Sequence, residues 1–181
     1  EGDVVECNVN IARRNQITKH HTATHILNGS ARKVLGSWVW QNSAFKDSDK
    51  ARLDITHYAA LTDEQVNDIE RLANDVVRMN LPVTVDILPR IEAERMYGFS
   101  LYQGGVAPSK NLRTISIGSF DVEGCGGTHI SHSGEIGLIK IIKTERIQDG
   151  VVRLEFVAGE KAVELIQKRG DLLSNISGIL E

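Results

Sequence analysis

Apolar positions repeat with a helical period in four segments of the chain. After the first segment, Gly36 stands where a left-handed residue ends a helix. The second begins at a capping box, in which Thr62 is followed three residues later by Gln65. The last keeps a 3-4 spacing that only Arg169 interrupts. Helices are therefore predicted over residues 12–35, between Thr62 and Pro82, near residues 90–97, and from Ala162 to Ile179.

Other segments alternate between apolar and polar positions, which indicates half-buried strands. Asp149 and Gly150 separate two such segments and suit a type I′ hairpin turn, because both central residues of that turn need a positive φ. Strands that are adjacent in sequence and mixed with helices indicate an α+β fold, with a mixed sheet packed with helices, rather than a doubly wound parallel sheet. Strands are predicted near residues 4–9, 38–45, 51–58, 83–87, 115–117, 136–147 and 151–157.

The composition narrows the class of protein. A chain of 181 residues that is 41% hydrophobic and 25% charged fits one soluble globular domain with a short appendage, and it excludes fibrous and disordered classes. No apolar run approaches the roughly 20 residues that a membrane-spanning helix needs. Two cysteines, Cys7 and Cys125, are too few for a disulfide framework, which favours a reducing compartment. We therefore expect a cytoplasmic protein.

The charge is distributed unevenly along the chain. A net charge of −3 argues against a uniformly basic surface that coats nucleic acid. Between Cys7 and Lys46 there is no acidic residue, so this stretch is a candidate for binding a polyanion, although a chance segregation of charge explains the pattern equally well. Its six basic residues are Arg13, Arg14, Lys19, Arg32, Lys33 and Lys46.

Two short motifs, separated by about 100 residues, carry the candidate chemistry. His21 and His25 are four residues apart on a predicted helix, so their imidazoles lie on one face and can share a metal ion. Cys125 and His129 are also four apart, and the glycines between them allow a tight bend. Each motif is weak alone, because such spacings arise by chance. Together they form a His₃Cys donor set, which suits Zn²⁺ best.

The helical wheel separates the histidines of the first motif. His20 falls inside the apolar arc of the predicted helix and is the better candidate for a buried core histidine, whereas His21 and His25 fall well outside it. No Glu follows His21, which excludes the metallopeptidase motif that needs this residue as a general base. No Asp or Glu adjoins either motif closely enough to be assigned as a base for hydrolysis.

The residues His21-Thr-Ala-Thr-His25-Ile-Leu-Asn28, combined with Cys125-Gly-Gly-Thr-His129, resemble the editing domain of alanyl-tRNA synthetases. This domain is shared with freestanding AlaX-type proteins and with the second additional domain of threonyl-tRNA synthetases. The likeness covers nearly the whole chain, and the loop at Gly104 and Gly105 is similar to archaeal members. One departure lies after Gln41, where the sequence Asn42-Ser43-Ala44 lacks a glycine that is usual in the family.

The resemblance implies a fold, a reaction and partners. It implies a zinc-containing editing domain over residues 1–158, with residues 1–10 as the end of a preceding barrel domain. Residues 159–181 would form a helix that leads into a dimerisation region of a longer parent, hence a homodimer. The implied reaction is hydrolysis of Ser-tRNA(Ala) and Gly-tRNA(Ala), because a synthetic pocket for a methyl side chain rejects serine and glycine poorly.

The resemblance also assigns residues to roles. Zn²⁺ would be bound by His21, His25, Cys125 and His129, and Thr24 and Gln41 match pocket positions that would bind the serine hydroxyl. For the acceptor end of tRNA(Ala), the candidate phosphate contacts are Arg13, Arg14, Lys19, Arg32 and Lys33.

Three alternatives stay open at this stage. The chain could be a freestanding AlaX-type editing protein, a threonyl-type editing domain, or a non-catalytic module that binds the acceptor end and holds a structural zinc. Four protein ligands would close a zinc site, whereas catalysis by the metal needs an open position. The zinc coordination number and the hydrolytic base are left undecided.

Overall fold

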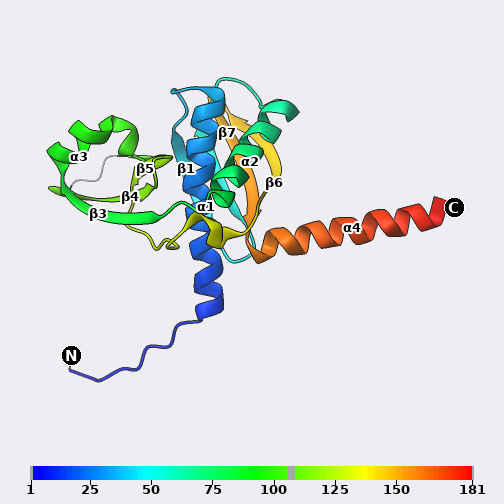
Figure 1. Ribbon diagram of the computed structural model, residues 1–181, viewed down its shortest axis with the longest axis horizontal. Helices are drawn as coiled ribbons and strands as arrows, with labels where there is room; N and C mark the ends of the chain where they lie inside the picture. The colour runs from blue at the N-terminus through cyan, green and yellow to red at the C-terminus, as the bar shows by residue number, and fades with distance from the viewer. Residues whose placement is uncertain (1, 106–108, 181) are drawn as a thin grey trace.

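A computed structural model describes residues 2–105 and 109–180. The α+β prediction is confirmed, and the strands form two sheets in which every pair is antiparallel. One sheet has four strands in the order β1-β2-β7-β6, and the other has three in the order β3-β4-β5 (Figure 1). The strands are β1 (Gln41–Lys46), β2 (Ala51–Thr56), β3 (Val83–Pro89), β4 (Asn111–Ile117), β5 (Asp121–Gly124), β6 (Ile139–Gln148) and β7 (Val151–Ala158). The helices are α1 (Ile11–Leu35), α2 (Asp63–Arg78), α3 (Arg90–Tyr97) and α4 (Glu160–Leu180), with 3₁₀ turns η1 (Gly98–Leu101) and η2 (Ser133–Ile136).

The main core lies between α1, α2 and the four-stranded sheet. Helix α1 runs through the middle of the molecule, and thirteen of its 25 residues are buried. The apolar face of this helix meets residues from the sheet that are fully buried, such as Leu53 and Phe156. A second, smaller core lies between the three-stranded sheet, α3 and η1, around Leu101 and Leu112. Helix α1 therefore lies next to both sheets, so its central residues can join groups from each.

The ends of the helices follow local sequence signals. The capping box at Thr62 and Gln65 is present as predicted, and the backbone nitrogen of Gln65 donates to the Thr62 hydroxyl at 3.2 Å. Gly36 ends α1 with φ +131, and Asn10 begins it by accepting a hydrogen bond from the backbone of Arg13. Because these caps satisfy backbone groups that the helix leaves open, the boundaries were within reach of sequence analysis.

Two local predictions were wrong. The segment 2–10 forms no strand and is exposed, because no neighbouring strand in the described structure takes up its backbone hydrogen bonds. The hairpin between β6 and β7 is present, but its turn is not type I′, since Gly150 has φ +71 while Asp149 is not left-handed. A register shift in β6 between Arg146 and Gln148 accommodates the turn instead.

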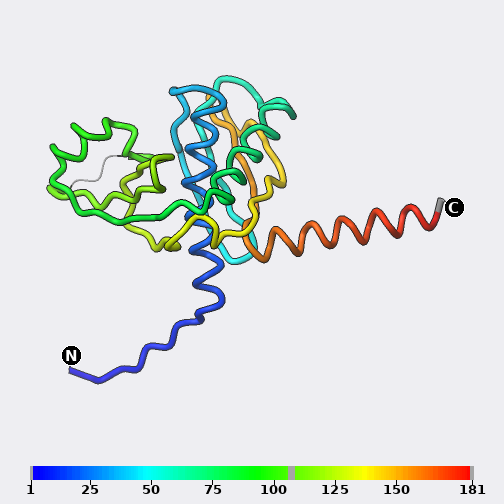
Figure 2. The backbone as a smooth tube through the Cα atoms, viewed as in Figure 1, coloured from blue at the N-terminus to red at the C-terminus, as the bar shows by residue number. Residues whose placement is uncertain are grey.

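The segment after β5 connects the two sheets. Figure 2 shows this segment passing from the three-stranded sheet alongside α1 before it enters β6. Its turn η2 contacts both α1 and α2, and Ile136 is buried in the main core. The sequence between Cys125 and His129 is thereby held against the middle of α1.

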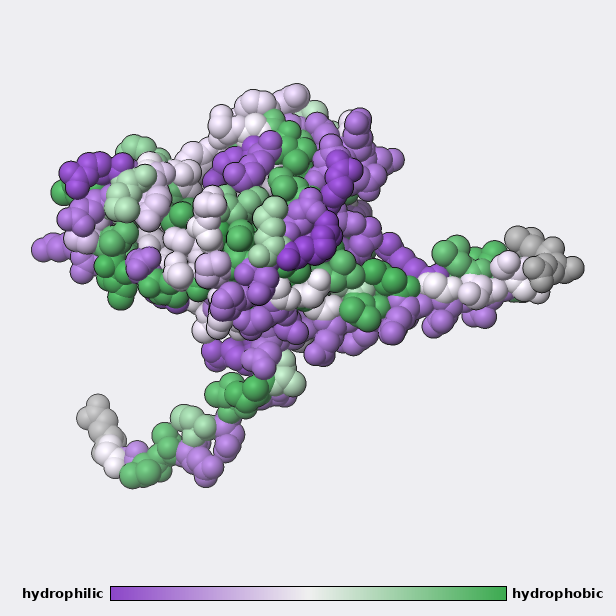
Figure 3. All heavy atoms as spheres, viewed as in Figure 1, coloured by the Kyte–Doolittle hydropathy of each residue, from purple (hydrophilic) through white to green (hydrophobic). Residues whose placement is uncertain are grey.

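Helix α4 extends away from the rest of the molecule (Figure 1). Apart from Ala162, which is buried, its apolar residues are largely exposed, and Figure 3 shows apolar surface along it. The apolar stripe predicted for this helix is thus present without a covering partner in the described chain. Within the described residues, no helix is long and apolar enough to span a membrane. The exposed apolar residues of α4 are Val163, Ile166, Leu172, Leu173, Ile176 and Ile179.

Candidate metal centre and adjoining pocket

Four side chains from the two predicted motifs converge beside α1. The candidate ligand atoms of His21, His25, Cys125 and His129 all lie within 4.8 Å of one another. The Cys125 Sγ is 3.4 Å from the Nε2 of His21, and the ring centroids of His21 and His129 are 4.4 Å apart. The prediction that these distant parts of the chain meet is confirmed.

The two ring nitrogens of His129 have different surroundings: one contacts the protein and the other is available to a metal. The His129 Nδ1 lies 3.1 Å from the Thr22 hydroxyl, which itself donates to the Thr18 carbonyl at 3.3 Å. That hydroxyl can only accept from His129, which places the proton of the neutral ring on Nδ1. The Nε2 of His129 is buried, has no hydrogen-bond partner in the described chain, and is free for a metal.

Glu123 is a member of this centre that sequence analysis missed. Its carboxylate is fully buried and lies 2.8 Å from the Nδ1 of His25, while the Asn28 side chain donates to its other oxygen at 2.7 Å. A carboxylate behind a histidine fixes the ring so that Nε2 points to the metal. Glu123 lies on β5, two positions before Cys125, which directly follows the end of that strand, and this spacing was the available signal.

The charges of the centre oppose one another. Burial acts to raise the pKa of the Cys125 thiol, but the nearby imidazoles of His129, His21 and His25 outweigh it and lower the pKa to about 3. Burial acts to lower the pKa of His25, but the charge of Glu123 and the contact with Cys125 outweigh it and raise the pKa to about 10. Burial lowers the pKa of His129 to about 4. Without metal, the centre is a thiolate paired with a protonated His25, so metal binding releases a proton.

From the low pKa of Cys125 we predict that the metal-free chain holds a thiolate at acidic pH. Because this pKa lies below the ordinary value of about 8.5, stabilisation by the thiolate is complete above about pH 8.5 and is lost as the pH falls through about 3. We expect the ultraviolet absorbance of a thiolate to persist in the folded chain at about pH 5. Cys125→Ser should remove this signal, whereas Cys7→Ser should keep it. If the absorbance of the wild-type chain disappeared as the pH fell through about 8, the low pKa assigned to Cys125 would be contradicted.

The donor set fits zinc. Bonds of about 2.0 Å to nitrogen and 2.3 Å to sulfur place the ligand atoms of a tetrahedral His₃Cys site roughly 3.3–3.5 Å apart. The four candidate ligand atoms lie within 4.8 Å of one another, which is close enough for them to hold one ion between them. One thiolate with three imidazoles is a borderline-soft set of the kind that favours Zn²⁺ over Mg²⁺ or Ca²⁺.

The bend between the two later ligands is held by Arg113 on β4. Its Nη1 donates to the carbonyls of Cys125 at 2.6 Å and Gly127 at 2.9 Å. A Cβ on Gly127 would lie 2.1 Å from the Cε1 of His21, so only glycine leaves room for this ring. The two glycines differ in this respect, because a Cβ on Gly126 would meet nothing within 4 Å.

Gly127→Ala is therefore expected to displace His21 and weaken metal binding. We expect zinc affinity to fall at least about tenfold, as for other changes that misplace a ligand. Gly126→Ala is the matched control, since it adds the same methyl group to the neighbouring position and should bind zinc as the wild type does. Competition with a chromogenic chelator measures both, and equal affinities for the two variants would contradict the packing argument.

A β-bulge decides which side chains of β1 lie on the face of the sheet that α1 covers. Gln41 pairs with Ile55 and Lys46 pairs with Ala51, and the register shifts between Gln41 and Ser43. Both partners on β2 are buried under α1. Because the bulge adds one residue to β1, Gln41 lies on the same face as Ala44 and Lys46. Without the bulge, strict alternation along β1 would have put Gln41 on the face opposite to Lys46.

The start of β1 contacts a loop from the other sheet. A Cβ on Gly104 would lie 3.2 Å from the carbonyl oxygen of Asn42. Asn28 on α1 donates to the Gln103 side chain at 3.0 Å. A pocket of about 450 Å³ opens between this loop, Arg113, Cys125 and Gly126. Of the four candidate ligands, Cys125 lines this pocket.

The two residues predicted to bind a serine hydroxyl have different surroundings. Thr24 is fully buried, and its hydroxyl donates to the His20 carbonyl at 2.8 Å, which leaves only acceptor capacity. Gln41 is half-buried at the start of β1. His20 is buried as predicted, with its Nδ1 2.6 Å from the Asp47 carbonyl oxygen, and it takes no part in the centre.

The basic residues predicted to contact phosphates also differ. Arg14 is exposed, and Arg13 is exposed with its guanidinium 2.9 Å from Asp47. Lys33 lies over the ring of Phe120 at 5.0 Å, with its side chain exposed. Arg32 requires a correction. Its side chain donates to the Val39 carbonyl at 3.2 Å and pairs with the buried Asp121 at 3.4 Å, so its charge is used inside the protein.

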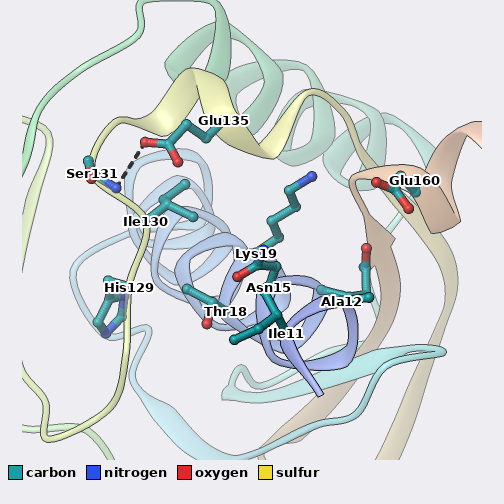
Figure 4. Close-up of a pocket in the computed structure, with 11 residues that line it drawn as sticks. Ile11, Ala12, Asn15, Thr18, Lys19, His129, Ile130, Ser131, Glu135 and Glu160 are labelled. Atoms are coloured by element: carbon teal, nitrogen blue, oxygen red, sulfur yellow. Dashed lines mark hydrogen bonds between the residues drawn. The ribbon is translucent and has the colours of Figure 1, made fainter. Parts of the chain in front are cut away.

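Another pocket, of about 610 Å³, lies between the first half of α1, the segment after His129 and the start of α4 (Figure 4). Its charged side chains are Lys19, Glu135 and Glu160. Figure 4 shows Glu135 bonded to the backbone of Ser131, at 3.0 Å. One lysine against two glutamates gives no positive surplus for phosphates, so this pocket is a poorer match for the end of a nucleic acid than the space beside Cys125.

Comparison with known proteins agrees with this geometry. Residues 112–155 match the family described as the threonyl and alanyl tRNA synthetase second additional domain. The chain is 58% identical over 164 residues to an alanine–tRNA ligase of Nitrosopumilus maritimus, and 51% identical over 179 residues to one of Methanothrix thermoacetophila. These alignments cover 91% and 99% of this chain but 18% and 20% of the relatives. The chain therefore spans about a fifth of the length of the curated relatives that it matches.

Proposed function

From the homology of this chain to a segment of archaeal alanine–tRNA ligases, which includes a match to the threonyl and alanyl tRNA synthetase second additional domain, we propose that it is the editing domain of such a ligase. Its reaction is the hydrolysis of Ser-tRNA(Ala) and Gly-tRNA(Ala) at the ester that joins the amino acid to the terminal adenosine. The observation that carries the proposal is the convergence of His21, His25, Cys125 and His129 beside a pocket.

Residues around the centre have separate roles in this proposal. Zn²⁺, if held by the four ligands, would supply positive charge that orders the pocket. Gln41 donates to the serine hydroxyl, and Thr24 accepts from it because its own hydrogen is already used by His20. An alanine ester would leave these buried groups unpaired, which favours hydrolysis of serine over alanine esters.

The parent protein and its assembly are part of the same proposal. We place the editing domain at residues 1–158, of which residues 1 and 106–108 lie outside the described structure. The exposed apolar side chains of α4 then form part of a dimer contact in a longer chain. The exposed charges of Arg13, Arg14 and Lys33 and the half-buried Lys19 contact the phosphates of the tRNA(Ala) acceptor end, and Arg32 is left out of this set.

A second candidate function is a non-catalytic module that binds the acceptor end with a structural zinc. The observation in its favour is that four protein donors fill a tetrahedral site and leave no position for water. Hydrolysis separates the two candidates, because only the first consumes the ester.

The test is a deacylation assay on the zinc-loaded chain with purified aminoacyl-tRNAs. We expect Ser-tRNA(Ala) and Gly-tRNA(Ala) to be hydrolysed and Ala-tRNA(Ala) to be spared, with Ser-tRNA(Thr) as the control for a threonyl-type activity. Binding of Ser-tRNA(Ala) without hydrolysis would support the structural module instead. Preference for Ser-tRNA(Thr) would reassign the domain.

A further inference from the structure

The pocket beside Cys125 is separate from the residues proposed to bind the serine hydroxyl. Among the described residues that line it, Arg113 is the one cationic side chain, there is no carboxylate, and neither Thr24 nor Gln41 is present. Its volume of about 450 Å³ is of the size that small organic ligands occupy. Because Cys125 is part of its wall, the pocket adjoins the candidate metal centre directly.

Arg113 connects this pocket with the bend that carries two of the candidate ligands. Its Nη1 donates to the carbonyl oxygens of Cys125 and Gly127, which uses both hydrogens of that nitrogen. A guanidinium has five N–H donors, so three remain on Nε and Nη2, and the described residues supply no partner for them. The half-buried side chain also pairs with no carboxylate in the described part of the chain. Arg113 is thus a fixed cation with donors available to an anion in the pocket.

Another part of the wall is apolar. Tyr102 lines the pocket, and its hydroxyl is held by Glu94 and by the Nε of Arg90, the latter at 3.1 Å. Leu112 also lines the pocket and packs in the same small core as Tyr102. An anchored aromatic ring next to an aliphatic side chain is a surface on which a nucleobase packs, because every base has a π-face.

A second pocket extends the cationic lining away from the centre. It shares Ser109 with the first pocket, and its other charged side chains are Arg90, which pairs with Glu94 at 3.0 Å, and the exposed Lys110. No carboxylate belongs to the described lining of this pocket either. Cations therefore follow the beginning of β4 from Arg113 to Lys110, as in a groove that tracks the phosphates of a single-stranded nucleic acid.

We propose that the pocket beside Cys125 binds the 3′-terminal nucleoside monophosphate unit of the tRNA, with Arg113 as the contact to its phosphate. The base packs on the apolar wall, the ribose lies next to Cys125, and the amino acid half of the ester extends toward Thr24 and Gln41. The proposal rests on the deacylase function and adds the place of the nucleotide half of the substrate.

The test measures, by calorimetry, the binding of adenosine 5′-monophosphate (AMP) and of adenosine to the zinc-loaded chain. We expect the wild type to bind AMP at least about tenfold more tightly than adenosine, as for hydrogen bonds to a charged group. Arg113→Met should remove this difference and leave the affinity for adenosine unchanged. Arg113→Lys should keep part of the difference because it retains a cation. On Ser-tRNA(Ala), Arg113→Met should raise KM at least about tenfold.

Gly126→Leu tests the location of the site independently of Arg113. Gly126 lines the pocket, and a Cβ there would meet nothing within 4 Å, so a larger side chain has room to extend without displacing a metal ligand. We expect this variant to bind AMP and adenosine more weakly than the wild type while its zinc affinity stays the same. Arg95→Met is the matched control for Arg113→Met, since Arg95 is exposed on α3 and lines neither pocket.

Four outcomes would overturn the proposal. The wild type could fail to bind AMP, or it could bind AMP and adenosine equally. Equal weakening of both ligands in Arg113→Met would indicate a structural role for this side chain. Wild-type affinity for AMP in Gly126→Leu would show that the nucleotide lies elsewhere. If binding follows the expectation but the wild-type chain leaves Ser-tRNA(Ala) intact, the deacylase function fails and the nucleotide site stands.

Discussion

His129→Ala is expected to reduce zinc content from one ion per chain to nearly none and to abolish deacylation of Ser-tRNA(Ala). The Nε2 of His129 is a buried nitrogen whose free lone pair faces the other three ligands, and no other described side chain can replace it. Losing the metal removes several kcal/mol of stabilisation, which corresponds to a rate at least about 10²-fold lower. His25→Ala should behave in the same way. Metal analysis of the purified variants and single-turnover hydrolysis measure the two effects.

His132→Ala serves as the control for this experiment. His132 lies three residues beyond His129, is exposed, and takes no part in the group of four ligands. We expect it to keep both zinc and activity. Full zinc occupancy with normal turnover in His25→Ala and His129→Ala would show that the converging side chains do not form the metal site.

Removal of the Glu123 side chain is expected to have the second-largest effect. Glu123→Ala leaves His25 buried without the carboxylate 2.8 Å from its Nδ1, and it also removes one of the two acceptors of Asn28. Breaking a buried pair from one side costs about 3 kcal/mol, which denaturant unfolding of the metal-free chain would detect. Zinc affinity should fall about 10- to 100-fold because His25 loses the group that orients it.

Two variants sharpen this prediction. Glu123→Gln keeps an oxygen that can accept from His25, so it should retain more zinc affinity than Glu123→Ala while losing the charge. Glu145→Ala removes an exposed carboxylate from β6 and should change neither unfolding nor zinc binding. If Glu123→Ala unfolds and binds zinc like the wild type, the carboxylate does not position His25.

Much of the fold was accessible from local sequence. The capping box at Thr62, the stop at Gly36 and the alternation of the later hairpin act over a few residues, and each appears in the structure. The strand predicted at residues 4–9 failed because strand formation depends on a partner, which an alternating pattern does not supply. The turn at Gly150 was misassigned because Asp149 does not adopt a positive φ, and the register of β6 shifts between Arg146 and Gln148, just before the turn.

The candidate site was predicted in part. The spacing of His21 and His25 put both on one helix face, and the wheel separated them from the buried His20. Glu123 was missed although it lies two positions before Cys125, because buried carboxylates are recognisable only once their partners are known. Arg32 was taken for a phosphate contact, since no local pattern shows that its charge meets Asp121 far along the chain.

The sequence by itself determined the helices and their ends, the spacing of each pair of ligands and the kind of metal that such donors prefer, because these depend on geometry within a turn or a strand. Tertiary structure decided that the two pairs meet, that Glu123 stands behind His25, and that a bulge turns Gln41 and Lys46 to the same side. These features arise from register and packing between segments far apart in the chain. A one-residue shift in the register of a strand would turn each of its side chains to the opposite face.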